Sequence, residues 1–381
     1  MTTRSLHITS QLWALLLIAG LGACTPWNEP EKEDPDAPQQ IFKLFWNQID
    51  QHYTCFAEHP VNWDSIYYTC LPVVRELQNT ENLVPVMQDI VKAIKDPELY
   101  VIPPDYAFLR TYPPASSDYS IGGFSFPYSG FDYSMENRSI EYYSSHGLST
   151  LNICHKTEGK LFRFAYIIEE HFRNTRTDIY NQELEKILQE DLDGCIVDLR
   201  YNHEGEFRNM ISFARLFFVG ERTILQTAKR KSKEDRFAMT SLQPYSVTGS
   251  GVVPGELPIV LIVNNMTYGP ANICAHILNL LPNVIVIGLT PTSGGGAEAS
   301  SVSLTNQWGL HFPNGVKYFI HGRSCEFPLQ PNVMVDPSAE IVEKLYEDGY
   351  LREVLHINAP LATALNLLEN LSSPSTNQLV K

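Results

Sequence analysis

The chain has 381 residues, with 28 Lys and Arg against 43 Asp and Glu, so its formal net charge is −15 at pH 7. A chain this acidic argues against nucleic-acid binding, because phosphate backbones are bound by clustered basic side chains. Its 44% hydrophobic and 19% charged residues exclude global disorder, and its 7 Cys are too few for a disulfide-built scaffold. The length allows roughly two or three domains.

A positive residue and a short apolar run open the chain. Arg4 precedes the apolar residues 12–21. Such a run forms a helix of about 15 Å, half of a ~30 Å hydrocarbon core, so it predicts a secretory signal and no membrane span. Leu-Gly-Ala-Cys at residues 21–24 resembles a bacterial lipobox. The resemblance implies that residues 1–23 are a lipoprotein signal peptide and that Cys24 is lipidated; an ordinary signal followed by a chance Cys is the alternative.

Residues 24–40 are acidic and rich in proline, which predicts an extended tether. The lipobox resemblance places the chain in the cell envelope, lipid-anchored to the outer membrane and facing the periplasm or the surface. That compartment permits disulfides, and Cys55 with Cys70 is the most plausible local pair. Cys195 and Cys274 lie in apolar runs and are predicted to be buried thiols.

Two different segments follow the tether. Residues 41–100 show apolar side chains at helical spacing until Asp96-Pro97 stops the pattern, which predicts a helical N-terminal domain. Residues 101–158 are rich in Tyr, Ser, Phe and Gly, which favours short strands and loops.

Residues 159–345 alternate between apolar strand-like and helix-like runs, and residues 346–381 predict a C-terminal helix and a loose tail. The alternation predicts an α/β fold with a largely parallel sheet covered by helices. The expected strands are 161–168, 194–200, 258–263 and 284–288, and the expected helices are 177–190, 207–217 and 271–281. Sites in such sheets form at the carboxyl ends of strands, which indicates the loops 198–205, 264–272 and 290–296.

Motifs in these loops resemble the tail-specific (C-terminal-processing) serine proteases, peptidase family S41, whose core is crotonase-like. The family motif Asp-Leu-Arg-x-Asn-x-Gly-Gly is matched by residues 198–205, with Asn202 and Gly205 retained and Glu204 replacing the first Gly. A glycine-rich family loop is matched loosely by residues 288–296, and the closing motif by residues 326–333. The closest branch resembles the tricorn protease core and lipoproteins of Bacteroides-type bacteria. Residues 101–158 carry no clear signature of the PDZ insert common in the family.

The resemblance assigns the catalytic positions, and most hold residues that cannot perform the chemistry. Asn272 aligns with the residue that opens the family's helix, so the nucleophile slot is Gly269. The base slot is Glu98, because residues 94–98 resemble Leu-x-Asp-Gly-His, and the lysine slot of the other branch is Gly294. Pro270 follows the nucleophile slot and lacks the N–H that serves as oxyanion donor in the family. The retained supporting acid, Glu326, is then expected to have nothing to orient.

These assignments predict a catalytically inactive homologue that binds extended peptide or protein segments, with Gly205, Glu204, Pro270 and Asn202 as binding residues. Gly269-Pro270 is equally an ordinary helix entry. The alternatives are an active serine endopeptidase that uses Thr267 or Ser293 as a displaced nucleophile with His203 as base, and a structural lipoprotein with a closed cleft.

Charge adds two further expectations. Glu98 and Glu204 would favour basic peptides if they enter the cleft, whereas the basic run 229–233 is predicted to be a solvated loop. No cofactor is expected. No metal site is expected either, because the sequence has no His-Glu-x-x-His and no paired Cys-x-x-Cys.

Overall fold

The computed structural model describes Asp34, residues 37–104, 133–135, 138–145, 148–157, 160–173, 184, 187–188, 191–200, 202–305, 307–336, 341–343, 346–347, 350–351, 355–357 and 359–372. The chain divides into two units, Met1–Asp34 and Pro35–Lys381, and the helices and strands belong to the second. The expected signal peptide, Cys24 and most of the expected helix 177–190 lie outside the described residues.

The N-terminal region is helical, as expected. It contains α1 (Pro38–His52), α2 (Trp63–Arg75), the short 3₁₀ helix η3 (Thr80–Asn82) and α3 (Leu83–Ile94). Proline at the start of α1 removes one of the N–H groups that would lack an intrahelical partner, and the Asn62 side chain caps α2 by accepting from Ser65 N. Lys95 adopts a left-handed conformation with φ 60° and ends α3 just before Asp96-Pro97.

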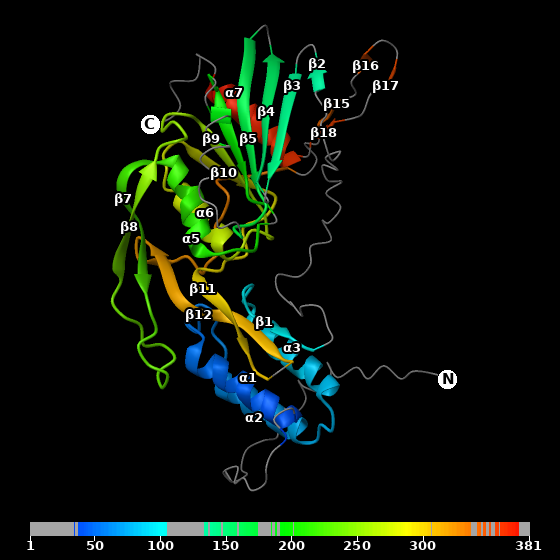
Figure 1. Cartoon of the computed structure of the whole chain (residues 1–381), viewed down its shortest axis with the longest axis vertical. Helices are drawn as coiled ribbons and strands as arrows, with labels where there is room; N and C mark the ends of the chain where they lie inside the picture. The colour runs from blue at the N-terminus through cyan, green and yellow to red at the C-terminus, as the bar shows by residue number, and fades with distance from the viewer. Residues whose placement is uncertain are drawn as a thin grey trace. The chain divides into compact units, whose positions relative to one another are not determined.

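The helical region shares its core with β-structure from far along the chain. Ile41, Phe45 and Ile49 of α1 belong to the same buried cluster as Leu310 and Phe312 of β12. Strand β1 (Tyr100–Ile102) also pairs antiparallel with β12 (Gly309–Ile320). Figure 1 shows α1, α2 and α3 beneath β11 and β12. The helical segment is therefore completed by β-structure that the sequence pattern did not assign to it.

The main sheet has 8 strands in the order β14-β10-β9-β6-β5-β4-β3-β2. Neighbouring strands from β5 to β14 in this order are parallel, and those from β5 to β2 are antiparallel. Residues 133–135, 138–145 and 148–157 thus extend the core sheet, although they were expected to form a separate segment, because β4 pairs along its whole length with β5. The strands are β2 (Tyr133–Met135), β3 (Arg138–Ser145), β4 (Leu148–Thr157), β5 (Lys160–Glu169), β6 (Gly194–Asp198), β9 (Ile259–Val263), β10 (Val284–Gly288) and β14 (Val333–Met334).

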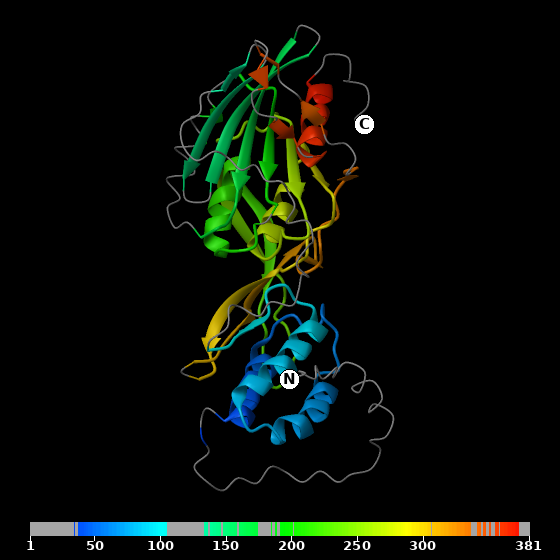
Figure 2. The same cartoon turned by 90° about the vertical axis from the view of Figure 1, so that its right-hand side faces the viewer.

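Helices cover both faces of the parallel part of this sheet, and side-chain alternation along β9 shows why. Ile259 and Leu261 face the cluster that contains α5 (Phe207–Ala214) and α6 (Pro270–Leu278). Val260 faces the opposite cluster, which contains α7 (Ala359–Leu371). Burial on both faces explains the unbroken apolar runs in the sequence. The predicted α/β fold with a parallel sheet is confirmed, and Figure 2 shows α7 against the sheet.

A second, 6-stranded sheet was not predicted. Its path is β1-β12-β7-β8, with β11 and β13 also paired to β12. Strand β8 alternates between exposed and half-buried residues and carries little apolar character, so its sequence gives no strand signal. The additional members are β7 (Val219–Ala228), β8 (Gln243–Ser250), β11 (Ala297–Ser303) and β13 (Arg323–Ser324), and the 3₁₀ helix η5 (Arg215–Phe217) precedes β7.

The C-terminal region differs in part from the expected helix and tail. Four short strands precede α7, namely β15 (Ile341–Glu343), β16 (Tyr346–Glu347), β17 (Tyr350–Leu351) and β18 (Leu355–Ile357). Cys55 and Cys70 are both free thiols, so the pairing considered for them is wrong, whereas Cys195 and Cys274 are buried as predicted. Among the described residues, no helix is both long and apolar enough to span a membrane.

Candidate active site

The nucleophile slot lies at the turn between β9 and α6. Gly269 is the N-cap of α6, with φ 60° and ψ −131°, a conformation that favours glycine. Its N–H donates to the carbonyl of Gly294 at 3.0 Å, so the two slots that the family resemblance assigns are neighbours. Gly294 itself has φ 88°, and a Cβ there would lie 2.3 Å from the Glu326 carbonyl oxygen. This backbone therefore leaves no room for a lysine at residue 294.

The base slot meets the nucleophile slot directly. A Cβ added to Gly269 would lie 2.3 Å from Glu98 Oε1, so the carboxylate occupies the space into which a nucleophilic side chain would project. Glu98 is 8% exposed. Its Oε1 has no hydrogen-bond partner among the described residues, while its Oε2 lies 3.5 Å from His311 Nε2.

The residue after the slot begins α6. Pro270 is the first helical residue, where its fixed φ suits the helix and its missing N–H breaks no intrahelical bond. The helix is then tied to the neighbouring loops through Asn272, whose side-chain amide donates to the carbonyls of Cys325 at 2.7 Å and Gly295 at 3.3 Å. Asn272 thus holds the motif loops together, and Gly269-Pro270 serves as the helix entry.

A buried cluster lies beside this loop. It consists of Tyr53, Cys55, His59, Asp96 and Glu326. Glu326 accepts hydrogen bonds from His59 Nε2 at 3.0 Å, from the Cys55 thiol at 3.3 Å and from Gly296 N at 2.7 Å. Asp96 accepts from the Tyr53 hydroxyl at 2.6 Å and from Glu98 N at 2.8 Å. The expectation that Glu326 has nothing to orient is wrong, because it pairs with His59.

Burial and charge set the protonation of the buried cluster. Burial opposes the imidazolium of His59, but its hydrogen bond to Glu326 and the charges of Asp96 and Glu326 outweigh that cost and raise its pKa to about 9. Burial, then the charge of Glu326, raises the pKa of Asp96 to about 7. Burial favours a neutral Glu326, but its contacts with His59 lower its pKa overall. At neutral pH the cluster therefore contains a charged His59–Glu326 pair.

Three members of the buried cluster have the chemistry of metal ligands. The thiol of Cys55 and the carboxylates of Asp96 and Glu326 offer atoms within 4.8 Å of one another. Protein groups already engage them, as the hydrogen bonds above show, and burial followed by the charge of Glu326 raises the pKa of the Cys55 thiol well above its usual value. A protonated thiol is a poor metal ligand and a poor nucleophile. The arrangement is therefore a closed hydrogen-bond network.

A cleft of about 830 Å³ opens beside Gly269. Of the predicted binding residues, Glu204, Gly205 and Pro270 line it, together with Glu98. Glu204 pairs there with Arg173, and Gly205, with φ 133°, approaches the Phe172 backbone so closely that a Cβ would lie 2.2 Å from its carbonyl carbon.

Asn202 has a different place. It is fully buried, and its amide donates to the Glu169 carbonyl at 2.9 Å, so it supports the loop and does not line the cleft. Its assignment as a binding residue is corrected accordingly.

The expected displaced nucleophiles do not reach the cleft. The hydroxyl of Thr267 donates to the Leu199 carbonyl at 2.8 Å and that of Ser293 to the Asn265 carbonyl at 2.5 Å, and both residues are buried. His203 does line the cleft, where its ring stacks on Tyr268 with centroids 5.2 Å apart. The structure therefore does not bring these three side chains together as a catalytic set.

A different serine, histidine and acid do meet. Ser301 Oγ lies 2.9 Å from His311 Nδ1, and His311 Nε2 lies 3.5 Å from Glu98 Oε2. Ser301 and His311 are direct partners across β11 and β12, and Glu98 lies two residues before β1, on the other side of β12. Sequence reasoning missed Ser301, His311 and His59, because only strand register and loop packing place them here. No local spacing marks them.

A glycine turn opens α6, a cleft lies beside it and a buried acid lies near it. Comparison with known proteins shows which family this arrangement resembles. The model of peptidase family S41 matches residues 163–335, and that of the tricorn protease C1 domain matches residues 34–92. Residues 163–335 therefore resemble peptidase family S41, the tail-specific proteases.

Individual proteins are similar to this chain in sequence or in fold. The chain is 27% identical over 208 residues to carboxyl-terminal-processing peptidase 3, chloroplastic, from Arabidopsis thaliana; the match covers 52% of this chain and 38% of that protein, so the chain spans well under half of the relative's length. A candidate peptidase from Parabacteroides merdae has a similar fold, with a TM-score of 0.60, 18% identity and coverage of 80% of this chain and 91% of that one. Mature CPAF is similar with a TM-score of 0.56, 10% identity and coverage of 88% and 96%.

Proposed function

We propose that this protein is a lipid-anchored member of family S41 that binds extended peptide or protein segments in its cleft without cleaving them. The observation that carries the proposal is the Glu98 carboxylate, which fills the space beside Gly269 where a nucleophile would stand. Family membership supplies the peptide ligand class, and the open cleft of about 830 Å³ supplies the room.

Each missing catalytic group lowers the expected rate of peptide hydrolysis. Without a hydroxyl or thiol at Gly269 there is no attacking atom, and loss of triad chemistry costs on the order of 10⁶ in rate. Pro270 removes an oxyanion donor, worth about 10²–10³. Glu98 replaces a histidine base with a carboxylate. Peptide binding is less affected, because backbone pairing at a sheet edge needs none of these groups.

The setting of the protein is part of the proposal. Cys24 carries the lipid, which is the membrane attachment, and the protein is held in the cell envelope at the outer membrane, facing the periplasm or the surface. Its net charge of −15 favours protein ligands over nucleic acid. Metabolic labelling with a radioactive or clickable fatty acid tests the anchor: Cys24→Ala should remove the label from the chain, and persistence of the label in that variant would refute lipidation at Cys24.

The test of the function uses residues 24–381 with Cys24→Ser. The folded protein is mixed with a diverse library of unstructured peptides, new termini are followed by mass spectrometry, and binding is followed by fluorescence anisotropy. Micromolar binding without cleavage above a mock preparation is expected. Cleavage that co-purifies with the protein would overturn inactivity, and absence of binding across the library would favour a purely structural lipoprotein.

One observation favours a second candidate function, a serine hydrolase with a displaced nucleophile. Ser301 Oγ would attack a carbonyl carbon while its proton passes to His311 Nδ1, with Glu98 orienting the ring through Nε2. The bond to the leaving alcohol or amine would then break as that group takes the proton from His311, and water would hydrolyse the acyl-enzyme to the free acid and restore the Ser301 hydroxyl. Ser301 does not line the cleft, although Glu98, His311 and the neighbouring Ser300 do, and for this reason we place it second.

Ser301→Ala separates the two candidates, with Ser300→Ala as the matched control one residue away. Ser300 Oγ bonds Asn314 Oδ1 at 2.9 Å and has no histidine partner among the described contacts. Under the first proposal, wild type and both variants show no turnover of activated esters or peptides. Turnover that disappears in Ser301→Ala and persists in Ser300→Ala would establish the second.

A further inference from the structure

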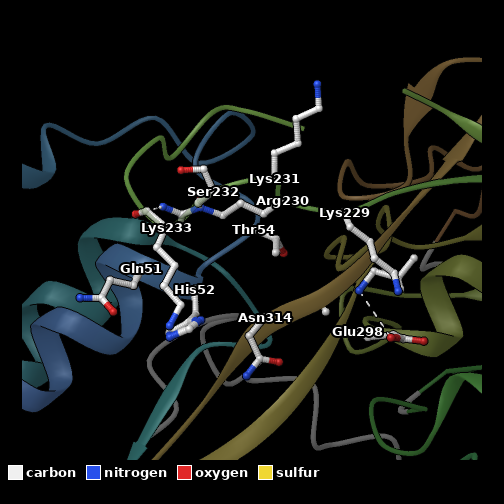
Figure 3. Close-up of a pocket in the computed structure, with 12 residues that line it drawn as sticks. Gln51, His52, Thr54, Lys229, Arg230, Lys231, Ser232, Lys233, Glu298 and Asn314 are labelled. Atoms are coloured by element: carbon white, nitrogen blue, oxygen red, sulfur yellow. Dashed lines mark hydrogen bonds between the residues drawn. The ribbon is translucent and has the colours of Figure 1, made fainter. Parts of the chain in front are cut away.

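A second pocket, of about 470 Å³, is lined by a cluster of basic side chains. It is lined by the basic run 229–233 that follows β7, by the end of α1 around His52, and by residues 314–316 of β12. We call it the basic pocket. Figure 3 shows the Lys233 side chain running toward His52, with Lys231 projecting away from the other labelled side chains. The expectation that this run is simply a solvated loop is therefore incomplete.

Two arginines fix the loop through hydrogen bonds, whereas the lysines of the loop form no ion pairs among the described residues. Arg230 donates to the carbonyls of Asp50 at 2.8 Å and Tyr53 at 3.2 Å. Arg236 bonds the carboxylates of Asp50 and Asp64, each at 2.7 Å. In contrast, no ion pair involves Lys229, Lys231 or Lys233 within the part of the chain that the structure describes. The loop is thus an anchored platform for three ammonium groups.

The basic pocket continues into the peptide cleft. Glu298, Asn314 and Gly315 line both cavities. The carboxylate at this junction, Glu298, accepts from the Tyr318 hydroxyl at 2.6 Å and from Val316 N at 3.4 Å. A ligand lying past Gly269 toward this junction therefore passes from the Glu98 carboxylate to the lysines.

The pKa of the histidine in the basic pocket reflects the electrostatic potential there. The pKa of His52 is lowered from its usual value, first by burial and then by the charges of Lys233 and Arg230. A cation is therefore disfavoured at this position. Of these causes, the positive charges of Lys233 and Arg230 also favour an anion, whereas burial opposes a charge of either sign.

We propose that the basic pocket binds carboxylate side chains of the peptide that occupies the cleft, so that ligands carry a cluster of acidic residues on one side of the segment lying over Gly269. This inference rests on the proposed peptide-binding function. Peptide is favoured over other anions because the pocket is continuous with the cleft. With Glu98 at the other end, the matching ligand has a basic or neutral residue over the slot and acidic residues beyond it.

The first experiment measures affinity by fluorescence anisotropy with residues 24–381 carrying Cys24→Ser. The probes are peptides of one scaffold with four Glu at one end, four Glu at the other end, or four Gln at either. The variant K229Q/K231Q/K233Q removes three charges from the basic pocket. The control K92Q/R222Q/R323Q removes three charges from exposed residues outside both cavities.

One Glu orientation should bind at least 10-fold more tightly than its Gln counterpart at low salt. The pocket variant should lose about 10-fold for that peptide and nothing for the Gln peptides, and the control should behave as wild type. The gain should shrink in 0.5 M NaCl, because salt screens exposed charges. Equal binding of Glu and Gln peptides would overturn this inference alone, whereas no binding of any peptide would overturn the proposed function.

Two further readouts locate the site and the ligand class. Proton NMR of the His52 ring should show its pKa rising when the acidic peptide binds and staying fixed with the Gln peptide. Vesicles with anionic lipid and a single-stranded oligonucleotide serve as competing anions. Displacement of the acidic peptide by either at equal charge concentration would contradict a peptide-specific pocket.

Discussion

The turn at Gly269 and the buried cluster around Glu326 lie beside one another, yet the acidic side chains in the two regions differ in their hydrogen bonding. At the turn, Glu98 Oε1 is buried without a hydrogen-bond partner among the described residues. In the buried cluster, Glu326 is satisfied by a histidine, a thiol and a backbone N–H. The difference teaches that Glu326 has a structural role through its pairing with His59, whereas Glu98 beside the turn makes no comparable set of hydrogen bonds.

The largest effect that tests this contrast is expected from Glu326→Gln. Its removal of the negative charge leaves the His59 imidazolium buried without its counter-charge, and breaking a buried pair in this way costs about 3–5 kcal/mol. The free energy of unfolding, measured by urea titration with tryptophan fluorescence, should fall by that amount. A fall of less than about 1 kcal/mol would mean that the pair contributes no more than a surface ion pair. The double variant with His59→Gln should recover part of the loss.

The second test is the pH dependence of stability. The folded pKa of His59, about 9, lies above its usual 6.5, so the folded state keeps a proton that the unfolded state releases in this range. The resulting stability is fully present below pH 6.5 and is lost as the pH rises through 9, by on the order of 3 kcal/mol. The pKa of Asp96, about 7 against a usual 3.8, acts in the same direction at lower pH. Burial also raises the pKa values of the thiols of Cys70, Cys195 and Cys325, which adds a decline of the same sign as the pH approaches 9. The window from pH 7 to 8, where thiols stay protonated in both states, therefore isolates His59.

Urea titrations across that window, on wild type and His59→Gln, make the comparison. The wild-type free energy of unfolding should decline with rising pH, and the variant should be nearly flat. If the free energy of unfolding of the variant declines with pH as steeply as that of wild type, another group binds the proton. The buried cluster would then contain no charged His59–Glu326 pair.

Some of the groups in these tests could be predicted from the sequence, and others could not. The helices and the parallel strands were predictable because their apolar residues repeat at local spacings. The family resemblance of residues 94–98, 264–272 and 326–333 pointed to Glu98, Gly269 and Glu326. His59 was missed because it lies in the connection between α1 and α2, where no periodicity operates. His311 and Ser301 meet Glu98 only through the register of β1, β12 and β11, and no local pattern encodes that pairing.

A third test puts a hydroxyl back into the nucleophile slot. Gly269→Ser places a Cβ 2.3 Å from Glu98 Oε1 and demands a φ of 60° with ψ −131° from a residue with a side chain. We expect a loss of about 1–3 kcal/mol in the free energy of unfolding and no peptide hydrolysis. Glu98→Ala in the same chain should return the steric part of that loss and still give no turnover, because Pro270 and the missing base remain. Robust turnover by Gly269→Ser alone would show that the slots are misassigned.

The smallest effect is expected from Glu98→Gln. This substitution is the same chemical change as Glu326→Gln, but it is made on a carboxylate whose Oε1 has no hydrogen-bond partner among the described residues. Glu98 Oε1 has no described hydrogen bond to lose, and His311 at 3.5 Å is 18% exposed, so water is available to it. The free energy of unfolding should change by less than about 1 kcal/mol, because the contact with the partly exposed His311 contributes little. Urea titration gives this change. Anisotropy should show weaker binding of peptides with a basic residue over the slot and unchanged binding of neutral ones. A loss as large as that of Glu326→Gln would place Glu98 in the same satisfied network and would end the contrast between the two regions.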